Sequence, residues 1–221
     1  MWAALITLVL ASAIEDAQAL ESAGDDRGAT NVLEKAVAAD PRWAIGRVEL
    51  GRLQLKLGET EYAWVHLDIA RTLAPENPRA HYLYALASDE LGRRRDARAA
   101  LEVALSLREG YADAQVRLAS VLFAEDDFAG AAATLKPYVA KHPEANGARL
   151  QLADALERSG DRKGAEHELR ALLAHPTLKQ LAGRRLVALL ESEGKHSEAE
   201  KVRQLIDPPK RQLRDLKPSR K

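Results

Sequence analysis

The feature that most constrains the fold is a 34-residue periodicity that runs through almost the whole chain. Glycine recurs at one position of this register, at Gly24, Gly58, Gly92, Gly160 and Gly194, and Asp126 stands at the position between the third and the fourth of them. Alanine recurs at a second position without exception, at Ala29, Ala63, Ala97, Ala131, Ala165 and Ala199. Self-similarity at a period of about 20–50 residues is typical of stacked-repeat proteins. The sequence therefore predicts one array of similar units that needs no single large core.

Each unit has the pattern of two helices. Two apolar stripes at helical spacing mark residues 44–77, with Leu50, Leu53 and Leu57 on the first and Ala63, Leu67 and Ala70 on the second. Gly58 lies between the stripes, where a left-handed residue ends the first helix. Prolines such as Pro41, Pro75 and Pro143 lie at the breaks between units, because proline cannot continue a preceding helix. We therefore expect six helical hairpins over residues 10–207, beginning near residues 10, 44, 78, 112, 146 and 180.

Composition agrees with an all-α fold. The chain of 221 residues is 46% hydrophobic but only 5% aromatic, and its apolar residues are mostly alanine and leucine, which favour helix over strand. The absence of cysteine excludes disulfides, thiolate nucleophiles and cysteine-ligated metals. The frequent alanine, arginine and leucine suggest a GC-rich bacterial source.

The pattern resembles that of the tetratricopeptide-repeat family, in which a large residue and a leucine–glycine pair are followed by a second-helix alanine and a bulky residue four positions later. The leucine–small pair stands as Leu50-Gly51, Tyr84-Ala85, Leu118-Ala119, Leu152-Ala153 and Leu186-Val187. Departures fall at the ends, with Asp16 in the first unit and Arg203 in the last, where solenoid units are commonly atypical. The resemblance implies an all-α, right-handed α-solenoid of about six hairpins, whose first helices line a concave groove.

The candidate binding residues lie on a second stripe of each first helix, away from the core stripe. They are Val48, Arg52 and Leu55, then Tyr82, Leu86 and Asp89, then Val116, Arg117, Ser120 and Phe123, then Leu150 and Asp154. Apolar residues on a second helix face indicate either further burial or a surface that binds a partner. We favour the groove interpretation, in which a peptide or helix of a partner protein contacts Arg52, Tyr82, Leu86 and Phe123. The alternative is that Leu86 and Phe123 only fill space between helices.

The ligand class of co-chaperone members of the family is not expected. Those proteins bind a carboxylate with Lys, Arg and Asn on these helix faces. Here the matching positions carry Val48, Leu83 and Leu86. The groove is therefore expected to bind a partner by a different chemistry.

No catalytic or cofactor motif is present. None of the six histidines lies in an H-E-x-x-H motif or at nucleophile spacing, and there is no phosphate-binding loop. The run Glu166-His167-Glu168 is not a metal site on this pattern, since consecutive residues point around a helix. We therefore predict a non-enzymatic protein without a cofactor or a metal.

Residues 1–13 form an apolar N-terminal segment with two interpretations. The run is too short to span a bilayer, but it matches the apolar region of a secretory signal and ends in Ala11-Ser12-Ala13. No basic residue precedes it, as Arg27 is the first in the chain. The alternative is a helix that caps the first repeat. We favour export to the periplasm or cell envelope, because a solenoid cap normally needs a polar outer face.

The C-terminal tail, residues 208–221, is basic. It holds six Lys and Arg against one Asp, which leaves 27 basic and 32 acidic residues in the rest of the chain. With prolines and isolated leucines it is expected to be disordered. A runner-up function follows from its charge, a regulator that associates with nucleic acid or a membrane through the tail. Nucleic acid is the less favoured of these, because the tail has no aromatic residue to stack on bases.

Overall fold

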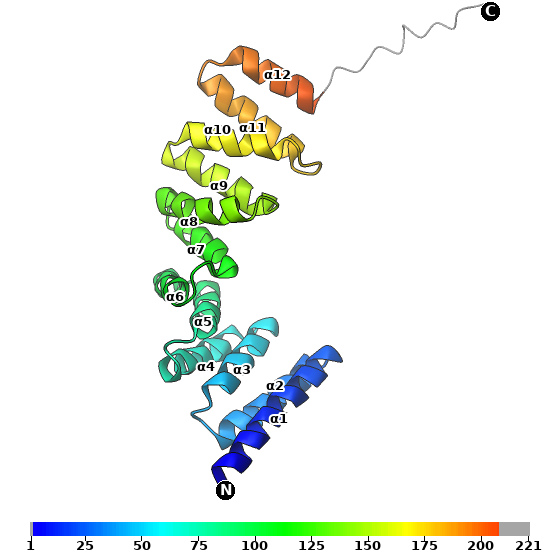
Figure 1. Cartoon of the computed structure of the whole chain (residues 1–221), viewed down its shortest axis with the longest axis vertical. Helices are drawn as coiled ribbons and strands as arrows, with labels where there is room; N and C mark the ends of the chain where they lie inside the picture. The colour runs from blue at the N-terminus through cyan, green and yellow to red at the C-terminus, as the bar shows by residue number, and fades with distance from the viewer. Residues whose placement is uncertain (1, 208–221) are drawn as a thin grey trace, which may run out of the picture. The chain divides into compact units, whose positions relative to one another are not determined.

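The computed structural model describes residues 2–207, with side chains from Leu10 onward, and all of its regular structure is helical (Figure 1). In chain order the helices are α1 (Trp2–Ser22), α2 (Asp26–Ala39), α3 (Ala44–Lys56), α4 (Thr60–Leu73), α5 (Pro78–Glu90), α6 (Arg94–Leu107), α7 (Ala112–Ala124), α8 (Phe128–Lys141), α9 (Asn146–Ser159), α10 (Arg162–Leu172), α11 (Lys179–Ser192) and α12 (His196–Ile206). No strand occurs in the described range. The prediction of an all-α helical repeat is confirmed.

The starts of the odd-numbered helices follow the 34-residue register. Helices α3, α5, α7 and α9 begin at residues 44, 78, 112 and 146, where units were expected to begin, and α11 begins at residue 179. Helix α1 is the exception, since it begins at Trp2, ahead of the expected start near residue 10. The handedness of a superhelix stays a prediction from the family resemblance.

The chain divides into two compact units, which we call the N-terminal unit (Met1–Asp126) and the C-terminal unit (Asp127–Lys221). The N-terminal unit contains α1 to α7, and the C-terminal unit contains α8 to α12. Within each unit, helices that are consecutive in the chain pack against one another. Every helix is therefore held mainly by its neighbours in sequence, as in other repeat arrays.

The turns inside the hairpins share one backbone conformation. The five glycines of the register have φ between 73° and 91°, and Asp126, at the equivalent position of the fourth repeat, has φ 60°. This left-handed conformation strains residues with a side chain, which explains why glycine recurs at the position. The predicted left-handed stop at Gly58 is confirmed.

The core is built from the alanine positions of the register and the residues one turn later. All six recurring alanines are at most 1% exposed. The residues four positions after the first five of them, Leu33, Leu67, Leu101, Leu135 and Leu169, are also at most 1% exposed. A Cβ atom added at Gly51 would lie 2.5 Å from Cγ of Leu67. Small residues therefore let the two helices of a hairpin approach closely.

Helix α8 runs through a proline. It extends from Phe128 to Lys141 without interruption and contains Pro137. The ring removes a backbone donor and crowds the carbonyl four residues earlier, so proline in a helix interior commonly causes a bend. The sequence predicts such a bend at Pro137, and its angle stays a prediction.

The N-terminal segment joins the first hairpin. Leu10 and Ala13 are buried and form a cluster with Ala36, against which Val32 and Trp43 also pack. These contacts agree with the cap interpretation of residues 1–13, and the export interpretation stays a prediction. Among the described residues, no helix is both long enough and apolar enough to cross a bilayer.

Candidate protein-binding surface

The twelve predicted binding residues all lie on odd-numbered helices, and we call the face of these helices that carries them, in each unit by itself, the first-helix surface. Ten lie on α3, α5 and α7 of the N-terminal unit, and Leu150 and Asp154 lie on α9 of the C-terminal unit. Eleven of them are half-buried. Val48 is different, because only 2% of its surface is exposed. The prediction that Val48 lies on an exposed stripe is wrong, since its short side chain is covered by the packed fold.

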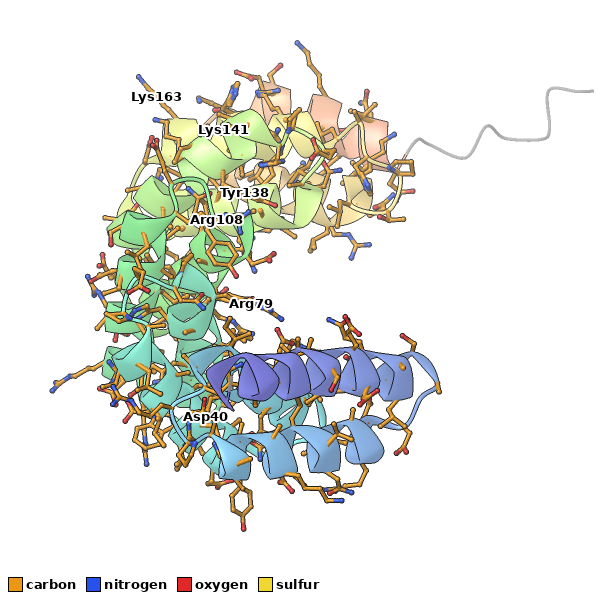
Figure 2. The ribbon with its side chains drawn as sticks, turned by 60° about the horizontal axis from the view of Figure 1, so that its bottom comes forward. Asp40, Arg79, Arg108, Tyr138, Lys141 and Lys163 are labelled. Atoms are coloured by element: carbon orange, nitrogen blue, oxygen red, sulfur yellow. The ribbon has the colours of Figure 1, made fainter. Side chains whose placement is uncertain are left out.

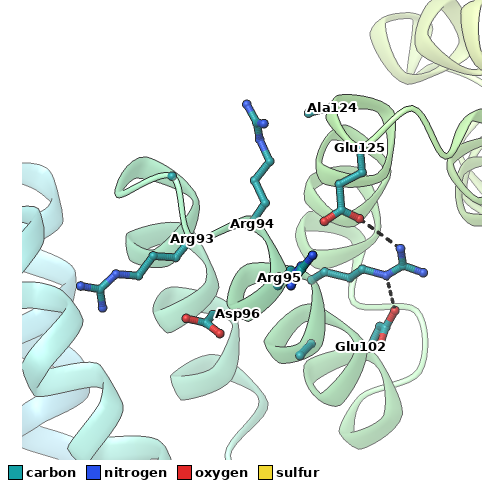
Figure 3. Close-up of a pocket in the computed structure, with 10 residues that line it drawn as sticks. Arg93, Arg94, Arg95, Asp96, Glu102, Ala124 and Glu125 are labelled. Carbon is teal, nitrogen blue, oxygen red and sulfur yellow. Dashed lines mark hydrogen bonds and ion pairs between the residues drawn. The ribbon is translucent and has the colours of Figure 1, made fainter.

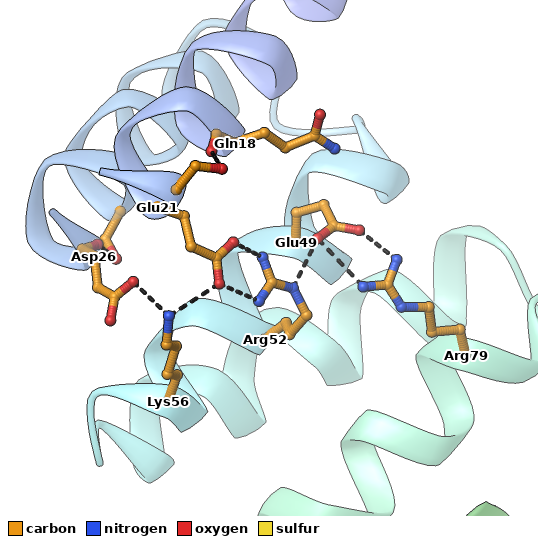
Figure 4. A network of polar contacts seen from close by, with 9 residues as sticks. Gln18, Glu21, Asp26, Glu49, Arg52, Lys56 and Arg79 are labelled. Atoms are coloured by element: carbon orange, nitrogen blue, oxygen red, sulfur yellow. Dashed lines mark hydrogen bonds and ion pairs between the residues drawn. The ribbon is translucent and has the colours of Figure 1, made fainter. Parts of the chain in front are cut away.

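Arg52 is the centre of an ion-pair network between the first two repeats (Figure 4). Its Nη1 and Nη2 atoms donate to the two carboxylate oxygens of Glu21 at 2.9 and 2.6 Å, and its Nε donates to Glu49 at 2.9 Å. Lys56 adds contacts to Glu21 at 3.1 Å and to Asp26 at 2.6 Å. The bidentate pairing of Arg52 with Glu21 therefore joins α3 to α1, and Lys56 joins α3 to α2 as well.

The network extends to the third repeat and shifts the pKa values of its members. Arg79 on α5 donates to both carboxylate oxygens of Glu49, one of them at 3.3 Å. The hydrogen bond from Arg52 lowers the pKa of Glu21 to about 2, although its partial burial opposes the shift. The same bond raises the pKa of Arg52. Arg52 is thus engaged by carboxylates of its own chain.

The other charged residues of the first-helix surface also pair between repeats. In the N-terminal unit, Arg117 on α7 contacts Asp89 on α5 at 3.4 Å. In the C-terminal unit, Arg185 on α11 contacts Asp154 and Glu157 on α9 at 2.7 and 2.8 Å. All four charged candidates, Arg52, Asp89, Arg117 and Asp154, therefore form ion pairs within the chain.

A spacing of two repeats could have revealed these pairs. The carboxylates Glu21, Asp89 and Glu157 are separated by 68 residues, and so are the cations Arg117 and Arg185. From the sequence, Arg52, Asp89, Arg117 and Asp154 are predicted to contact a partner, because the pattern of one helix does not show which residues of the next repeat lie opposite. In the structure, these charges are paired with residues of adjacent repeats.

Tyr82 of the first-helix surface belongs to a cluster with Arg79, Arg108 and Tyr111, which we call the tyrosine cluster. The rings of Tyr82 on α5 and Tyr111 before α7 lie 5.1 Å apart between centroids. The guanidinium of Arg108 lies 4.8 Å from the centroid of the Tyr111 ring, a cation–π distance. Figure 2 shows where Arg79 and Arg108 project from the N-terminal unit.

Burial raises the pKa of both tyrosine hydroxyls, and nearby charges modify the shifts. Asp113 raises both values further, whereas Arg117 opposes the rise at Tyr82. Arg108 and Arg79 oppose it at Tyr111, so both cations act on that hydroxyl. Arg79 is paired with Glu49, but Arg108 makes no hydrogen bond or ion pair with a carboxylate among the described residues. The cluster therefore combines two half-buried rings with one cation that has no carboxylate partner.

Tyr111 and Arg108 were missed by the sequence analysis. Both lie outside the first-helix stripes, in the segment that connects α6 to α7. The available signal was that Tyr111 follows Trp43 by 68 residues, at the same position of the turn between repeats. Helical periodicity predicts only residues on helix faces, so it does not reach the turn between α6 and α7.

The remaining predicted residues supply apolar and small surface beside these groups. Leu55, Leu86, Val116 and Phe123 are half-buried, so part of each side chain is accessible. Ser120 donates a hydrogen bond to the carbonyl oxygen of Val116 at 3.1 Å, which uses its hydroxyl within the helix.

The chemistry of the described residues offers no grouping of metal ligands. No set of three or more His, Asp or Glu side chains converges in the part of the chain that the structure describes. In the run Glu166-His167-Glu168, Glu166 contacts Lys195 at 2.8 Å, Glu168 contacts Arg149 at 2.6 Å, and His167 is exposed. The two carboxylates point to different partners, as expected for consecutive helical residues. The basic tail, residues 208–221, lies outside the described residues.

Comparison with known proteins identifies the repeat. A family model described as tetratricopeptide repeat matches residues 90–146. No curated protein sequence matches the chain. The fold is similar to the crystal structure of MamA, with 21% identity and a TM-score of 0.69 over 85% of this chain and 95% of MamA.

Two further solved structures have the same fold. YrrB, described as a tetratricopeptide-repeat protein with an unusual peptide-binding site, is 19% identical with a TM-score of 0.71, over 79% of this chain and 90% of YrrB. A tetratricopeptide-repeat protein from Parabacteroides merdae is 17% identical with a TM-score of 0.68, over 88% and 77% of the two chains. The repeated residues, the helical hairpins and these matches agree: residues 90–146 match the tetratricopeptide-repeat family, and the chain has the helical-repeat fold of tetratricopeptide-repeat proteins.

Proposed function

We propose that the protein is a non-enzymatic adaptor that holds a peptide or helix of a partner protein on its first-helix surface, within a larger bacterial assembly. The observation that carries this proposal is the tyrosine cluster, in which Tyr82 and Tyr111 lie 5.1 Å apart beside Arg108. Tyrosine and arginine are enriched among the residues that dominate binding energy at protein interfaces. The peptide-binding site described for YrrB gives further support.

The internal ion pairs change which side chains would bind the partner. Arg52 already donates to Glu21 and Glu49, so a carboxylate of the partner would have to replace contacts that the chain makes itself. Arg117 and Asp89 are similarly paired. In our proposal these groups hold the repeats in place, and Tyr82, Leu86 and Phe123 supply the main contact area. Leu150 and Asp154 are the corresponding positions of the C-terminal unit.

The proposal is tested with the Tyr82→Ala, Phe123→Ala double variant. Loss of two aromatic contacts is expected to weaken binding by about 2 kcal/mol or more, which is roughly thirtyfold. The full chain first captures its partner from cell extract, and affinity for the purified partner is then measured by calorimetry. The Tyr62→Ala variant is the matched control, because Tyr62 is 67% exposed on the second helix α4.

The results of this test distinguish binding on the first-helix surface from binding through the C-terminal tail. A folded double variant that binds the partner as tightly as the unchanged chain would exclude the first-helix surface. The runner-up function predicts instead that binding needs residues 208–221 and weakens steeply as salt is raised, as binding through phosphate contacts does. Binding through tyrosine and phenylalanine depends much less on salt.

A further inference from the structure

The turn between α5 and α6 carries an arginine-rich pocket that is separate from the first-helix surface. The pocket has a volume of about 830 Å³. Its lining comes from this turn, the first three turns of α6 and the end of α7. It consists of Gly92, Arg93, Arg94, Arg95, Asp96, Arg98, Ala99, Glu102, Ala124 and Glu125 (Figure 3). None of the twelve predicted binding residues is part of it. We propose that this pocket is a second binding site, which takes an acidic segment of a protein partner.

Two of the three carboxylates in the lining share one arginine. Arg98 donates from Nε to Glu102 at 3.0 Å and from Nη1 to Glu125 at 3.1 Å, as the dashed lines in Figure 3 show. The contact with Glu125 joins α6 to the end of α7 and forms one wall of the pocket. Arg98 is therefore a structural cation, and Asp96 is the carboxylate left to balance the other arginines.

The three consecutive arginines have no carboxylate partner among the described residues. Arg93 is held by an aromatic ring instead, with its guanidinium 4.1 Å from the centroid of Trp64. Arg94 and Arg95 are exposed, and the structure gives their side chains no ion pair or hydrogen bond within the described range. Guanidinium groups bind carboxylates with two parallel hydrogen bonds. The lining thus holds four arginines against three carboxylates, and the side chains of Arg94 and Arg95 are left to bind an acidic group.

The residue before the second helix differs between the repeats. In three of them, Asp25, Asp127 and Asp161 accept hydrogen bonds from the backbone amides of Gly28, Gly130 and Gly164 at 2.8 to 2.9 Å. These aspartates precede α2, α8 and α10. The corresponding residue before α6 is Arg93, which makes no such bond. The position before the second helix therefore carries a carboxylate in four repeats, including Glu59 before α4, and a basic residue in two, Arg93 before α6 and Lys195 before α12.

The lining favours an acidic peptide over nucleic acid. No aromatic residue lines the pocket, so bases would have no ring on which to stack. Asp96, Glu102 and Glu125 would repel a continuous phosphate backbone. Separate carboxylates on an extended peptide can reach Arg94 and Arg95 while avoiding these acids. The site is independent of the proposed groove, and the two can fail separately.

The test measures binding of a fluorescein-labelled peptide, in which four glutamates alternate with glycines, to the full chain by fluorescence anisotropy. At about 50 mM salt, we expect saturable binding that weakens at higher salt, because exposed charges are screened. The Arg94→Ala, Arg95→Ala variant should bind at least about tenfold more weakly, since each charge-assisted hydrogen bond contributes strongly. The matched control Lys35→Ala, Lys136→Ala removes the same charge from two other exposed positions and should bind normally.

Three results would overturn the proposal. The first is equal affinity of the arginine variant and the unchanged chain. The second is an equal loss in the lysine control, which would show attraction to overall charge. The third is tighter binding of a ten-nucleotide oligothymidylate than of the glutamate peptide. Thermal melting of each variant checks that it is folded, and the Tyr82→Ala, Phe123→Ala variant should bind the glutamate peptide unchanged.

Discussion

Ala97 has no exposed surface, and neither has Leu101 one turn later on α6. A methyl group is the whole side chain at this position, so the backbone of α6 can approach the preceding helix. The same relation holds for Ala63 and Leu67 on α4. At the residue scale, the repeat is therefore specified by size: a small residue where helices approach closely and a large one beside it.

The first prediction concerns this close approach. Ala97→Leu should destabilise the protein by about 1–3 kcal/mol, the usual cost of overpacking a filled core. Urea denaturation of the variant and the unchanged chain measures the difference. Ala99→Leu on the same helix is the control, because Ala99 is exposed and its replacement should cost little. Equal losses in the two variants would contradict the assignment of Ala97 to the helix contact.

The ion pair of Glu21 with Arg52 gives a second prediction at this scale. The pKa of Glu21 in the folded protein is about 2, below its ordinary value of 4.5. The unfolded chain therefore takes up the proton first, and the stability that the pair contributes is present above pH 4.5 and lost as pH falls toward 2. We expect Glu21→Gln to be less stable than the unchanged chain at pH 6 and to differ little from it near pH 2.

Urea denaturation at a series of pH values checks this dependence. Glu15→Gln is a suitable control, because Glu15 is exposed on the same helix and has no partner described in the structure. If the stability difference between Glu21→Gln and the unchanged chain stays constant from pH 6 to pH 2, the ion pair of Glu21 with Arg52 is not its cause.

At the scale of helices and turns, polar side chains connect helices α3 and α5 to the loops that precede them. Nε of Arg47 donates to the carbonyl oxygen of Pro41 at 2.8 Å. One repeat later, Nε2 of His81 lies 2.8 Å from the carbonyl oxygen of Pro75. Both side chains reach six residues back, and both are buried. The junctions therefore satisfy loop carbonyls that would otherwise lack a donor.

The third prediction belongs to the turns inside the hairpins. Asp126 is the single non-glycine residue with positive φ in the described range, at the position where five other repeats have glycine. Asp126→Gly should relieve this strain and raise stability by up to about 1 kcal/mol, less the entropy that glycine adds to the unfolded chain. Thermal melting measures the change. The reverse replacement in the third repeat, Gly92→Asp, should lower stability, and a gain there would refute the argument.

At the scale of the whole molecule, helix α1 is longer than its equivalents and begins the N-terminal unit. Repeat arrays gain stability from nearest-neighbour contacts, so loss of a terminal helix segment is felt mainly by the adjacent repeat. The cluster of Leu10, Ala13 and Ala36 is such a contact, and Trp43 packs against it. The N-terminal residues therefore have a structural role besides any role in export.

The fourth prediction tests this role. A chain that begins at Ile14 should keep its helices but lose about 2 kcal/mol of stability, close to the value of burying one leucine side chain. Exposure of Trp43 should shift tryptophan fluorescence to longer wavelength. Leu10→Ala in the full chain should reproduce part of the loss. If the shortened chain melts at an unchanged temperature, residues 1–13 are dispensable and the export interpretation gains support.

Much of this protein could be predicted without coordinates, because the relevant physics is local. The left-handed turn at Gly58, the buried alanines and the helix starts each depend on residues within one hairpin, and the 34-residue spacing repeats that information six times. Periodic pattern and turn chemistry are the strongest signals that a single sequence carries.

The candidate surface was less predictable, because its properties depend on residues one or two repeats away. Val48 is covered, Arg52 is paired with Glu21, and Tyr82 meets Tyr111. Each of these outcomes depends on the rotation between neighbouring hairpins and on the length of the side chains that face each other across it. A helix pattern specifies which face a residue occupies, whereas packing between repeats decides what that face meets and how much of it stays accessible.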